Sequence, residues 1–332
     1  MRCWVSRRRS TGAGFALLAL CGAVASLLLF PPRASARSAG ATVVVGRAAT
    51  LTVPFDRLAR QLPAWRFRQQ SAGSRFLLRK LLSLGERFDL LAVADTSLFA
   101  QHQRRIGWWL EFASNQLVLA YTPRSRYAGQ ITARNWPRIL LRPNVRFGYA
   151  DPNLDPEGYN TLLAWKLTAR RRQRPGLYRR LKSAPGALVR PQSVALLALL
   201  EAGEIDYAWE YRSVARQHHL RFVTLPDAVN LGSADFAAAY AQVSVPVAGR
   251  APGQTAREHG RPIRYAITIP ATARNIPGAL AFLKRLASPR GRAVLAASYQ
   301  TPLAPPCRGG RLARAPAAAR HWLRQWPVCP QS

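Results

Sequence analysis

Acidic residues, histidine, cysteine and methionine are all scarce in this sequence. Of its 332 residues, 15 are Asp or Glu against 49 Lys or Arg, so the formal net charge is +34. None of the five histidines has the spacing of metal ligands, and there is no HExxH, no CxxC and no glycine-rich phosphate loop. These absences remove support for most metalloenzymes and nucleotide hydrolases that a motif can identify. No Ser-His-Asp set, activated Cys or cofactor loop is visible, so we predict neither catalysis nor a cofactor.

Apolar residues, by contrast, are abundant. They make up 48% of the chain, which is enough for a hydrophobic core and excludes disorder for most of the sequence. The length indicates about two domains.

The positive charge attracts anions, so nucleic acid has to be considered as a partner. The densest basic stretch, Lys166 to Arg190, holds nine basic residues and no acid, but it has few aromatic side chains on which bases could stack. A solvated helix face explains this stretch more simply. We therefore expect no nucleic-acid partner, although a basic exported protein that binds nucleic acid or an anionic surface stays open as an alternative.

The N-terminus has the pattern of an export signal. Arginines at the start precede an uncharged, mostly apolar stretch from Ala13 to Phe30, and Ala34-Ser35-Ala36 follows as a small-residue cleavage site. We predict a signal peptide over 1–36 and a periplasmic or extracytoplasmic protein, with an uncleaved anchor or lipidation at Cys21 as alternatives. Cleavage would remove five Arg and no acid, leaving a net charge of 34 − 5 = +29.

The exported chain would keep two cysteines, Cys307 and Cys329. An even number in an oxidising compartment favours a disulfide, with two free thiols as the alternative. The bond would close a C-terminal tail, 307–332, which we interpret as an appendage because the sequence after Pro306 becomes rich in Gly, Arg and Ala.

Short apolar strands alternate with amphipathic helical stretches through the rest of the chain, which predicts an α/β fold. Hydroxyl or acidic residues stand where strands lead into helices: Thr50, Ser74 and the loop from Asp151 to Gly158. Free N–H groups and the positive end of the helix dipole favour an anion at such positions. Each residue alone could be an ordinary helix cap, whereas the three together favour a bound oxyanion.

Several stretches resemble the exported tungstate/molybdate-binding proteins of ABC transporters, in their archaeal-type branch. The likeness covers about Val45 to Pro306, and its most specific part is a DPNLDPxG loop followed by DYAxEYxSVA. The matching stretches are SAGSRFLLRKL, FDLLAVADTSLF, FASNQLVLAYT, FGYADPNLDPEGYNTL, RPQSVALLALLEAGEIDYAWEYRSVA, LPDAVNLGS and IRYAITIP.

This resemblance implies a periplasmic binding protein of type II, in which two α/β lobes are joined by two crossover strands. It implies a monomer that captures tungstate or molybdate and delivers it to an ABC permease in the membrane. The expected crossovers lie near Leu117 to Thr122 and Ile263 to Pro270. The expected lobes are 37–120 plus 265–306 for lobe I and 121–264 for lobe II.

The resemblance also implies the site. Hydroxyl and backbone groups would hold the oxyanion, and two carboxylates, Asp155 and Glu210, would reach its metal atom. The remaining positions carried over are Ala49, Thr50, Ser74 and the backbone of Pro156 and Glu157. Two departures stand out, because Ala49 replaces a glycine and Glu157 adds a negative charge where a small residue is usual. Another oxyanion or a metal ion is therefore an alternative ligand.

Carboxylates beside a dianion need a physical reason. At about 4 Å and an effective dielectric constant of about 20, each pair of like unit charges costs about 4 kcal/mol. Tungsten(VI) and molybdenum(VI) are hard centres that can accept further oxygen ligands, so a carboxylate oxygen could bond the metal. Sulfate and phosphate lack this route. Without the resemblance, Asp155 would be interpreted as a turn residue and Glu210 as a salt-bridge partner of Arg212.

Overall fold

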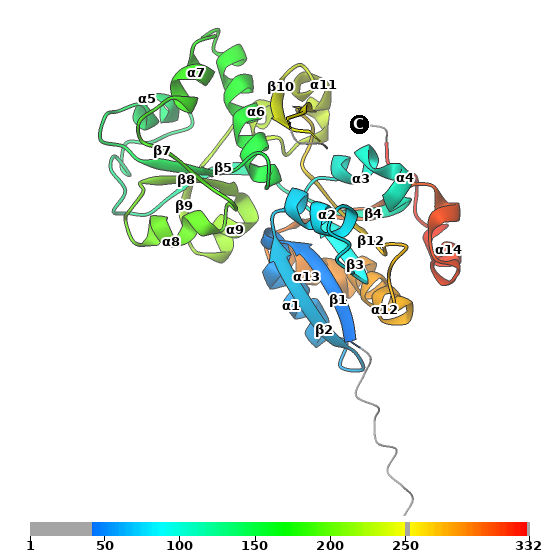
Figure 1. Ribbon diagram of the computed structural model, residues 1–332. Helices are drawn as coiled ribbons and strands as arrows, with labels where there is room; N and C mark the ends of the chain where they lie inside the picture. Colours follow the sequence, from blue (N-terminus) through cyan, green and yellow to red (C-terminus); the bar gives the residue numbers. More distant parts are fainter. Residues whose placement is uncertain (1–41, 250–252, 331–332) are drawn as a thin grey trace, which may run out of the picture. The chain divides into compact units, whose positions relative to one another are not determined.

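Two mixed β-sheets, each covered by helices on both faces, organise the chain (Figure 1). The computed structural model describes residues 42–249 and 253–330, so the predicted signal peptide lies outside the described residues. The first sheet has six strands in the order β13-β4-β12-β3-β1-β2. Their bounds are β1 Thr42–Ala48, β2 Arg66–Ala72, β3 Leu90–Val93, β4 Trp108–Ser114, β12 Arg264–Thr268 and β13 Thr301–Gly310.

Amphipathic helices cover both faces of this sheet. Leu58 of α1 and Phe282 of α12 pack on one face with Val43 and Leu90, while Leu77 and Leu78 of α2 belong to the core of the other face. Burying each such side chain contributes about 1.5–3 kcal/mol. The helices are α1 Thr52–Arg60, α12 Ile276–Ala287 and α13 Pro289–Ala297 on the first face, and α2 Ser74–Leu82, α3 Ser97–Gln101 and α4 Gln103–Ile106 on the second.

The second sheet has five strands in the order β7-β6-β8-β5-β9. On one face Trp209 meets Trp136 and Trp165 edge to face, with ring centroids 5.0 and 6.0 Å apart, which builds the core under α6. The strands are β5 Leu117–Tyr121, β6 Phe147–Ala150, β7 Ala187–Arg190, β8 Tyr207–Tyr211 and β9 Arg221–Thr224. The helices are α5 Trp136–Leu140, α6 Pro156–Arg171 and α7 Leu177–Lys182 on that face, and α8 Ala195–Glu201 and α9 Arg212–Gln217 on the other. Short elements follow: α10 Asp227–Asn230, α11 Ala237–Tyr240, and the hairpin of β10 Ser244–Ala248 with β11 Thr255–His259.

The chain passes between the sheets earlier than the sequence predicted. The expected boundary at residue 120 falls inside β5, which pairs with β8 and β9 in the second sheet. The passage lies at Asn115 and Gln116, the polar break between the apolar strands β4 and β5. The return to the first sheet comes at β12. The expected arrangement of two α/β lobes is present, with the first crossover moved a few residues toward the N-terminus.

The C-terminal segment is less of an appendage than the sequence indicated. Strand β13 runs through Pro306, and Cys307 to Gly310 pair with β4 at the edge of the first sheet. Helix α14, Ala317–Leu323, buries Ala319 and Leu323 in the core. A disulfide joins Cys307 to Cys329, whose Cα atoms are 4.9 Å apart. Among the helices of the described residues, none is long and apolar enough to cross a bilayer.

We expect this disulfide to stabilise the first lobe. Replacing Cys307 and Cys329 by Ser should lower the free energy of unfolding by about 3 kcal/mol. The two cysteines are 22 residues apart in the sequence, and without the bond the unfolded chain regains the conformational entropy that closing this loop removes. Urea titration of the wild type with and without reductant measures the same loss, and the double variant should not respond to reductant. A wild type whose unfolding is unchanged by reductant would contradict this role.

Candidate functional site

Asp155 begins α6 at the end of the loop that follows β6. Its side chain is the N-cap: Oδ1 accepts a hydrogen bond of 3.1 Å from the backbone N–H of Glu157, and Pro156 occupies the first turn. An acidic cap followed by proline is a favourable helix start, so the local sequence fixes this geometry. The second oxygen, Oδ2, accepts a longer bond of 3.4 Å from the backbone N–H of Ser193, and the residue is buried.

Glu210 lies within β8, next to β6 in the same sheet, and is fully buried. Its Oε1 accepts hydrogen bonds from the N–H of Tyr211 at 2.8 Å and from the hydroxyl of Ser193 at 3.1 Å. Its Oε2 is buried and has no hydrogen-bond partner among the described residues. Ser193 therefore donates to both acids, through its N–H to Asp155 and through its hydroxyl to Glu210, and brings the two predicted carboxylates together.

Glu157 uses its carboxylate for hydrogen bonds within the second lobe. Its Oε2 accepts a bond of 2.7 Å from the N–H of Ala150, and its Oε1 accepts one from the hydroxyl of Thr161. The fully buried side chain thus ties the first turn of α6 to the end of β6. Its N–H donates to Asp155, so the backbone of Glu157 contacts a predicted ligand residue while its own carboxylate bonds within the second lobe.

Burial raises the pKa of all three acids. The pKa of Asp155 rises to about 6 and that of Glu210 to about 8, chiefly because burial penalises the charged form, with hydrogen-bond donors offsetting part of the shift. The pKa of Glu157 is raised well above its usual range by burial and then by the neighbouring charge of Glu210. Three acids in one low-dielectric region therefore resist being ionised together.

The predicted hydroxyl residues come from the first lobe. Ala49 and Thr50 form a buried turn directly after β1, and the Thr50 hydroxyl lies 3.1 Å from the hydroxyl of Tyr265. Burial raises the pKa of Tyr265, the hydrogen bonds with Thr50 and Asn115 lower it, and the charges of Glu210 and Asp155 raise it further.

Ser74 is the first residue of α2, and its buried hydroxyl oxygen accepts a bond of 2.9 Å from the N–H of Ala94. The neighbouring Gly73 meets the loop of the second lobe, since a Cβ at this position would lie 2.4 Å from the carbonyl oxygen of Leu154 and 3.3 Å from the Cα of Asp155. The structure thus brings Ser74 close to the loop that ends in Asp155.

Three further polar residues of this region were not predicted from the sequence: Ser193, Tyr265 and Asn115. The side-chain amide of Asn115 donates to the hydroxyls of Ser213 at 2.8 Å and of Tyr265 at 3.0 Å, at the crossover between the lobes. In the sequence, the only indication of a role for Asn115 was that it is a polar residue between two apolar strands.

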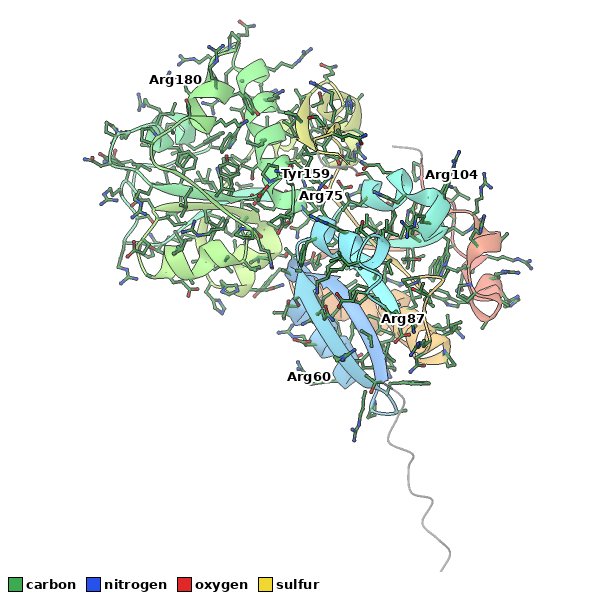
Figure 2. All side chains as sticks on the ribbon, viewed as in Figure 1. Arg60, Arg75, Arg87, Arg104, Tyr159 and Arg180 are labelled. Atoms are coloured by element: carbon green, nitrogen blue, oxygen red, sulfur yellow. A yellow bond between two sulfur atoms is a disulfide. The ribbon has the colours of Figure 1, made fainter. Side chains whose placement is uncertain are left out.

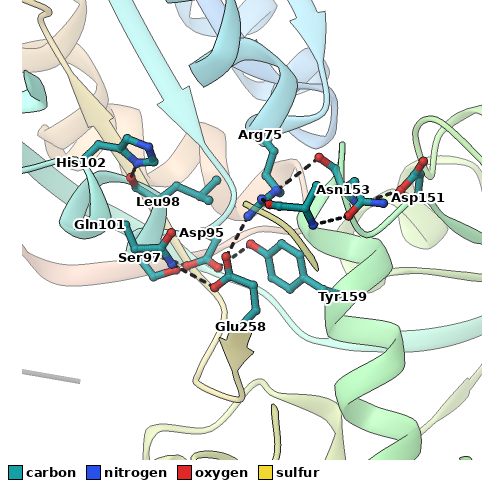
Figure 3. A network of polar contacts seen from close by, with 11 residues as sticks. Arg75, Asp95, Ser97, Leu98, Gln101, His102, Asp151, Asn153, Tyr159 and Glu258 are labelled. Atoms are coloured by element: carbon teal, nitrogen blue, oxygen red, sulfur yellow. Dashed lines mark hydrogen bonds and ion pairs between the residues drawn. The ribbon is translucent and has the colours of Figure 1, made fainter. Parts of the chain in front are cut away.

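A second polar network joins the two lobes through Arg75, Glu258, Tyr159 and Asp95 (Figure 3). Arg75 of α2 donates to Glu258 of the hairpin at 2.8 Å, to the carbonyl of Ala248 at 2.7 Å and to that of Asn153 at 3.3 Å. On α6, the hydroxyl of Tyr159 donates to Asp95 at 2.5 Å. These contacts hold the loop before Asp155 against the first lobe.

One further group of potential metal ligands occurs among the described residues. The carboxylate of Glu111 and the sulfurs of Cys307 and Cys329 lie within 4.8 Å of one another. Because the two sulfurs are bonded to each other, they are not available as thiolate ligands.

Comparison with relatives of known sequence supports the resemblance. A solute-binding protein of Petrotoga mobilis is 39% identical over 289 residues, which cover 85% of this chain and 90% of the relative. The molybdate/tungstate-binding protein WtpA of Pyrococcus abyssi is 30% identical over 306 residues, which cover 82% of this chain and 88% of WtpA. The likeness to tungstate/molybdate-binding proteins that the sequence motifs predicted is therefore confirmed.

Solved structures support the fold. The periplasmic molybdate-binding protein of Azotobacter vinelandii matches with a TM-score of 0.57 at 13% identity, over 78% of this chain and 98% of that one. The sulfate-binding protein SubI of Mycobacterium tuberculosis H37Rv matches with a TM-score of 0.56 at 14% identity, over 87% of this chain and 92% of that one. At such identities the likeness concerns the fold alone, and it confirms the predicted type II architecture.

A sequence profile of the bacterial extracellular solute-binding proteins matches residues 45–299, which span both lobes and every predicted ligand position. The chain thus belongs to the bacterial extracellular solute-binding protein family.

Proposed function

We propose that this protein captures tungstate or molybdate between its lobes outside the cytoplasmic membrane and delivers it to an ABC permease. The observation that carries the proposal is the pair of buried carboxylates joined by Ser193. A buried oxygen without a donor, such as Oε2 of Glu210, costs about 1–3 kcal/mol in a folded protein unless a ligand satisfies it. A hexavalent metal centre that accepts the carboxylate oxygens would satisfy it.

In this proposal Asp155 and Glu210 bond the metal atom, and groups of the first lobe hold the oxo oxygens. Thr50 and Ser74 supply hydroxyls, Ala49 supplies its backbone N–H, and the backbone of Pro156 and Glu157 lines the remaining wall. In their ionised form the same carboxylates repel sulfate, which cannot take a further oxygen ligand. The basic surface would speed the approach of a dilute dianion, and salt would reduce that effect.

The carboxylates should be needed individually. Asp155→Asn and Glu210→Gln should each weaken tungstate binding by about 100-fold, or about 2.8 kcal/mol, because the neutral amide is a poor ligand for the metal. Isothermal titration with tungstate, molybdate and sulfate measures this. Glu204→Gln is the matched control, because Glu204 is 60% exposed. An unchanged tungstate affinity in either site variant, or equal weak binding of all three anions by the wild type, would remove the proposed ligands.

Closure should depend on Gly73. A methyl group there would collide with the carbonyl of Leu154, so Gly73→Ala should keep the lobes apart, lower tungstate affinity at least tenfold and accelerate its release. Stopped-flow release kinetics and small-angle scattering with and without tungstate measure the two effects. The control is Gly129→Ala, where an added Cβ meets no atom within 4 Å. If Gly73→Ala compacts and releases tungstate like the control, closure does not use this contact.

The ligand-free protein should lose stability as the pH rises. Because the folded pKa values of Asp155 and Glu210 are raised to about 6 and about 8, the native state binds more protons than the unfolded state between about pH 4 and pH 8. The free energy of unfolding should therefore fall across this window, and Glu210→Gln should reduce the fall. Urea titrations at several pH values measure the slope, with Glu204→Gln as control. A Glu210→Gln variant with the wild-type slope would show that Glu210 ionises without penalty.

A further inference from the structure

A groove in the second lobe is lined by arginines and lies outside the oxyanion site. It has a volume of about 1270 Å³ and is bordered by α5 and the loop after it, the C-terminal end of α6, and α7. No Asp or Glu lines it. The arginines that line it are Arg134, Arg138, Arg142, Arg171, Arg172, Arg174 and Arg180.

Two of these arginines are fixed by the protein. Arg172 donates to the backbone carbonyls of Arg134 and Ala133 at 2.7 and 2.9 Å, and the guanidinium of Arg142 lies 3.9 Å from the ring centre of Tyr127. The other five are exposed, and within the described part of the chain their side chains have no ion pair or hydrogen bond. The groove therefore presents five arginine side chains that can bind an anion.

The arginines repel one another, and no acidic side chain in the lining of the groove compensates their positive charge. Burial lowers the pKa of Arg172, and the charge of Arg174 lowers it further. With no acid in the lining, the countercharge must come from outside the protein, and a concave surface of one sign concentrates anions.

The groove is remote from the proposed oxyanion ligands. Asp155 is the N-cap of α6, and Arg171 is the last of the 16 residues of this helix. At about 1.5 Å per residue the two ends are roughly 24 Å apart. Anion binding in the groove and in the oxyanion site can therefore be measured independently.

We propose that the groove binds a linear polyanion of linked phosphate groups that carries no bases. The guanidinium group presents a planar fork of donors that matches two phosphate oxygens, and a groove lined by several such forks and by no acid suits a repeating phosphate chain. Nucleic acid fits less well, since Trp136 in the lining is buried and the ring of Tyr127 is covered by Arg142, which leaves no aromatic platform for bases. A flat lipid surface would contact only the rim of this groove.

The test uses inorganic polyphosphate as the probe and two variants with the same change in charge. The groove variant is Arg138→Gln/Arg174→Gln/Arg180→Gln. The control is Arg60→Gln/Arg87→Gln/Arg104→Gln, at exposed positions outside the groove (Figure 2). Fluorescence anisotropy of labelled polyphosphate is measured against each full-length protein, and tungstate titration is measured in parallel.

We expect the wild type and the control to bind polyphosphate alike and the groove variant to bind at least tenfold more weakly. With about five phosphate contacts, wild-type affinity should fall about 100-fold from about 50 to about 200 mM salt, and the groove variant should show a shallower dependence. Tungstate affinity should be the same in all three proteins, which keeps this proposal separate from the proposed transport function.

Equal losses in the two variants would overturn the proposal, because the binding would then reflect net charge alone. So would tighter binding of single-stranded DNA or of anionic phospholipid vesicles than of polyphosphate, which would assign the groove to another class of partner. A groove variant that also loses tungstate binding would contradict the independence of the two sites.

Discussion

The burial of two carboxylates around one serine is the constraint on which the site depends. Strands β6 and β8 are parallel neighbours, so their C-terminal ends open at the same edge of the second sheet. Asp155 follows the first strand and Glu210 lies in the second, and Ser193, which follows β7, donates to both. Charged groups are costly in such a place unless they are satisfied. One buried oxygen of Glu210 nevertheless has no donor among the described residues, and under the proposed function a ligand would satisfy it.

The local part of this site was predictable from the sequence. An acid followed by proline after a strand predicts a helix start, and that start is where Asp155 lies. Glu210 was assigned from the family resemblance, because no local pattern distinguishes it from a salt-bridge partner. In the structure Glu210 bonds to Ser193, and the ion pairs of the described residues do not include one between Glu210 and Arg212. That contact forms because two segments that are separate in the sequence meet in the fold, so the spacing of residues along the chain does not predict it.

The contacts of Glu157 were not predicted, although the sequence holds a signal for them. The resemblance implied only that its charge lies beside the ligand, whereas in the structure its side chain bonds to the backbone of β6 and to Thr161, one helical turn further on. The spacing of Glu157 and Thr161 places both on one side of a helix, which was a readable indication of this contact. The edge strand β13 was missed for a different reason: its prolines and glycines are poor strand formers, and pairing with β4 overrides that preference.

The scarcity of acids on the surface follows from their use inside. Eight of the fifteen acidic residues are buried, whereas among the basic residues of the described chain only Arg47 is buried. The remaining seven acids cannot balance a basic surface, so the outside is strongly positive while the site between the lobes is rich in carboxylates. Under the proposed chemistry a dianion is attracted to the molecule, and the ionised carboxylates repel it at the last step unless it can bond their oxygens. The same segregation of charge that favours capture of any anion would, under the proposed chemistry, admit only those whose central atom accepts another ligand.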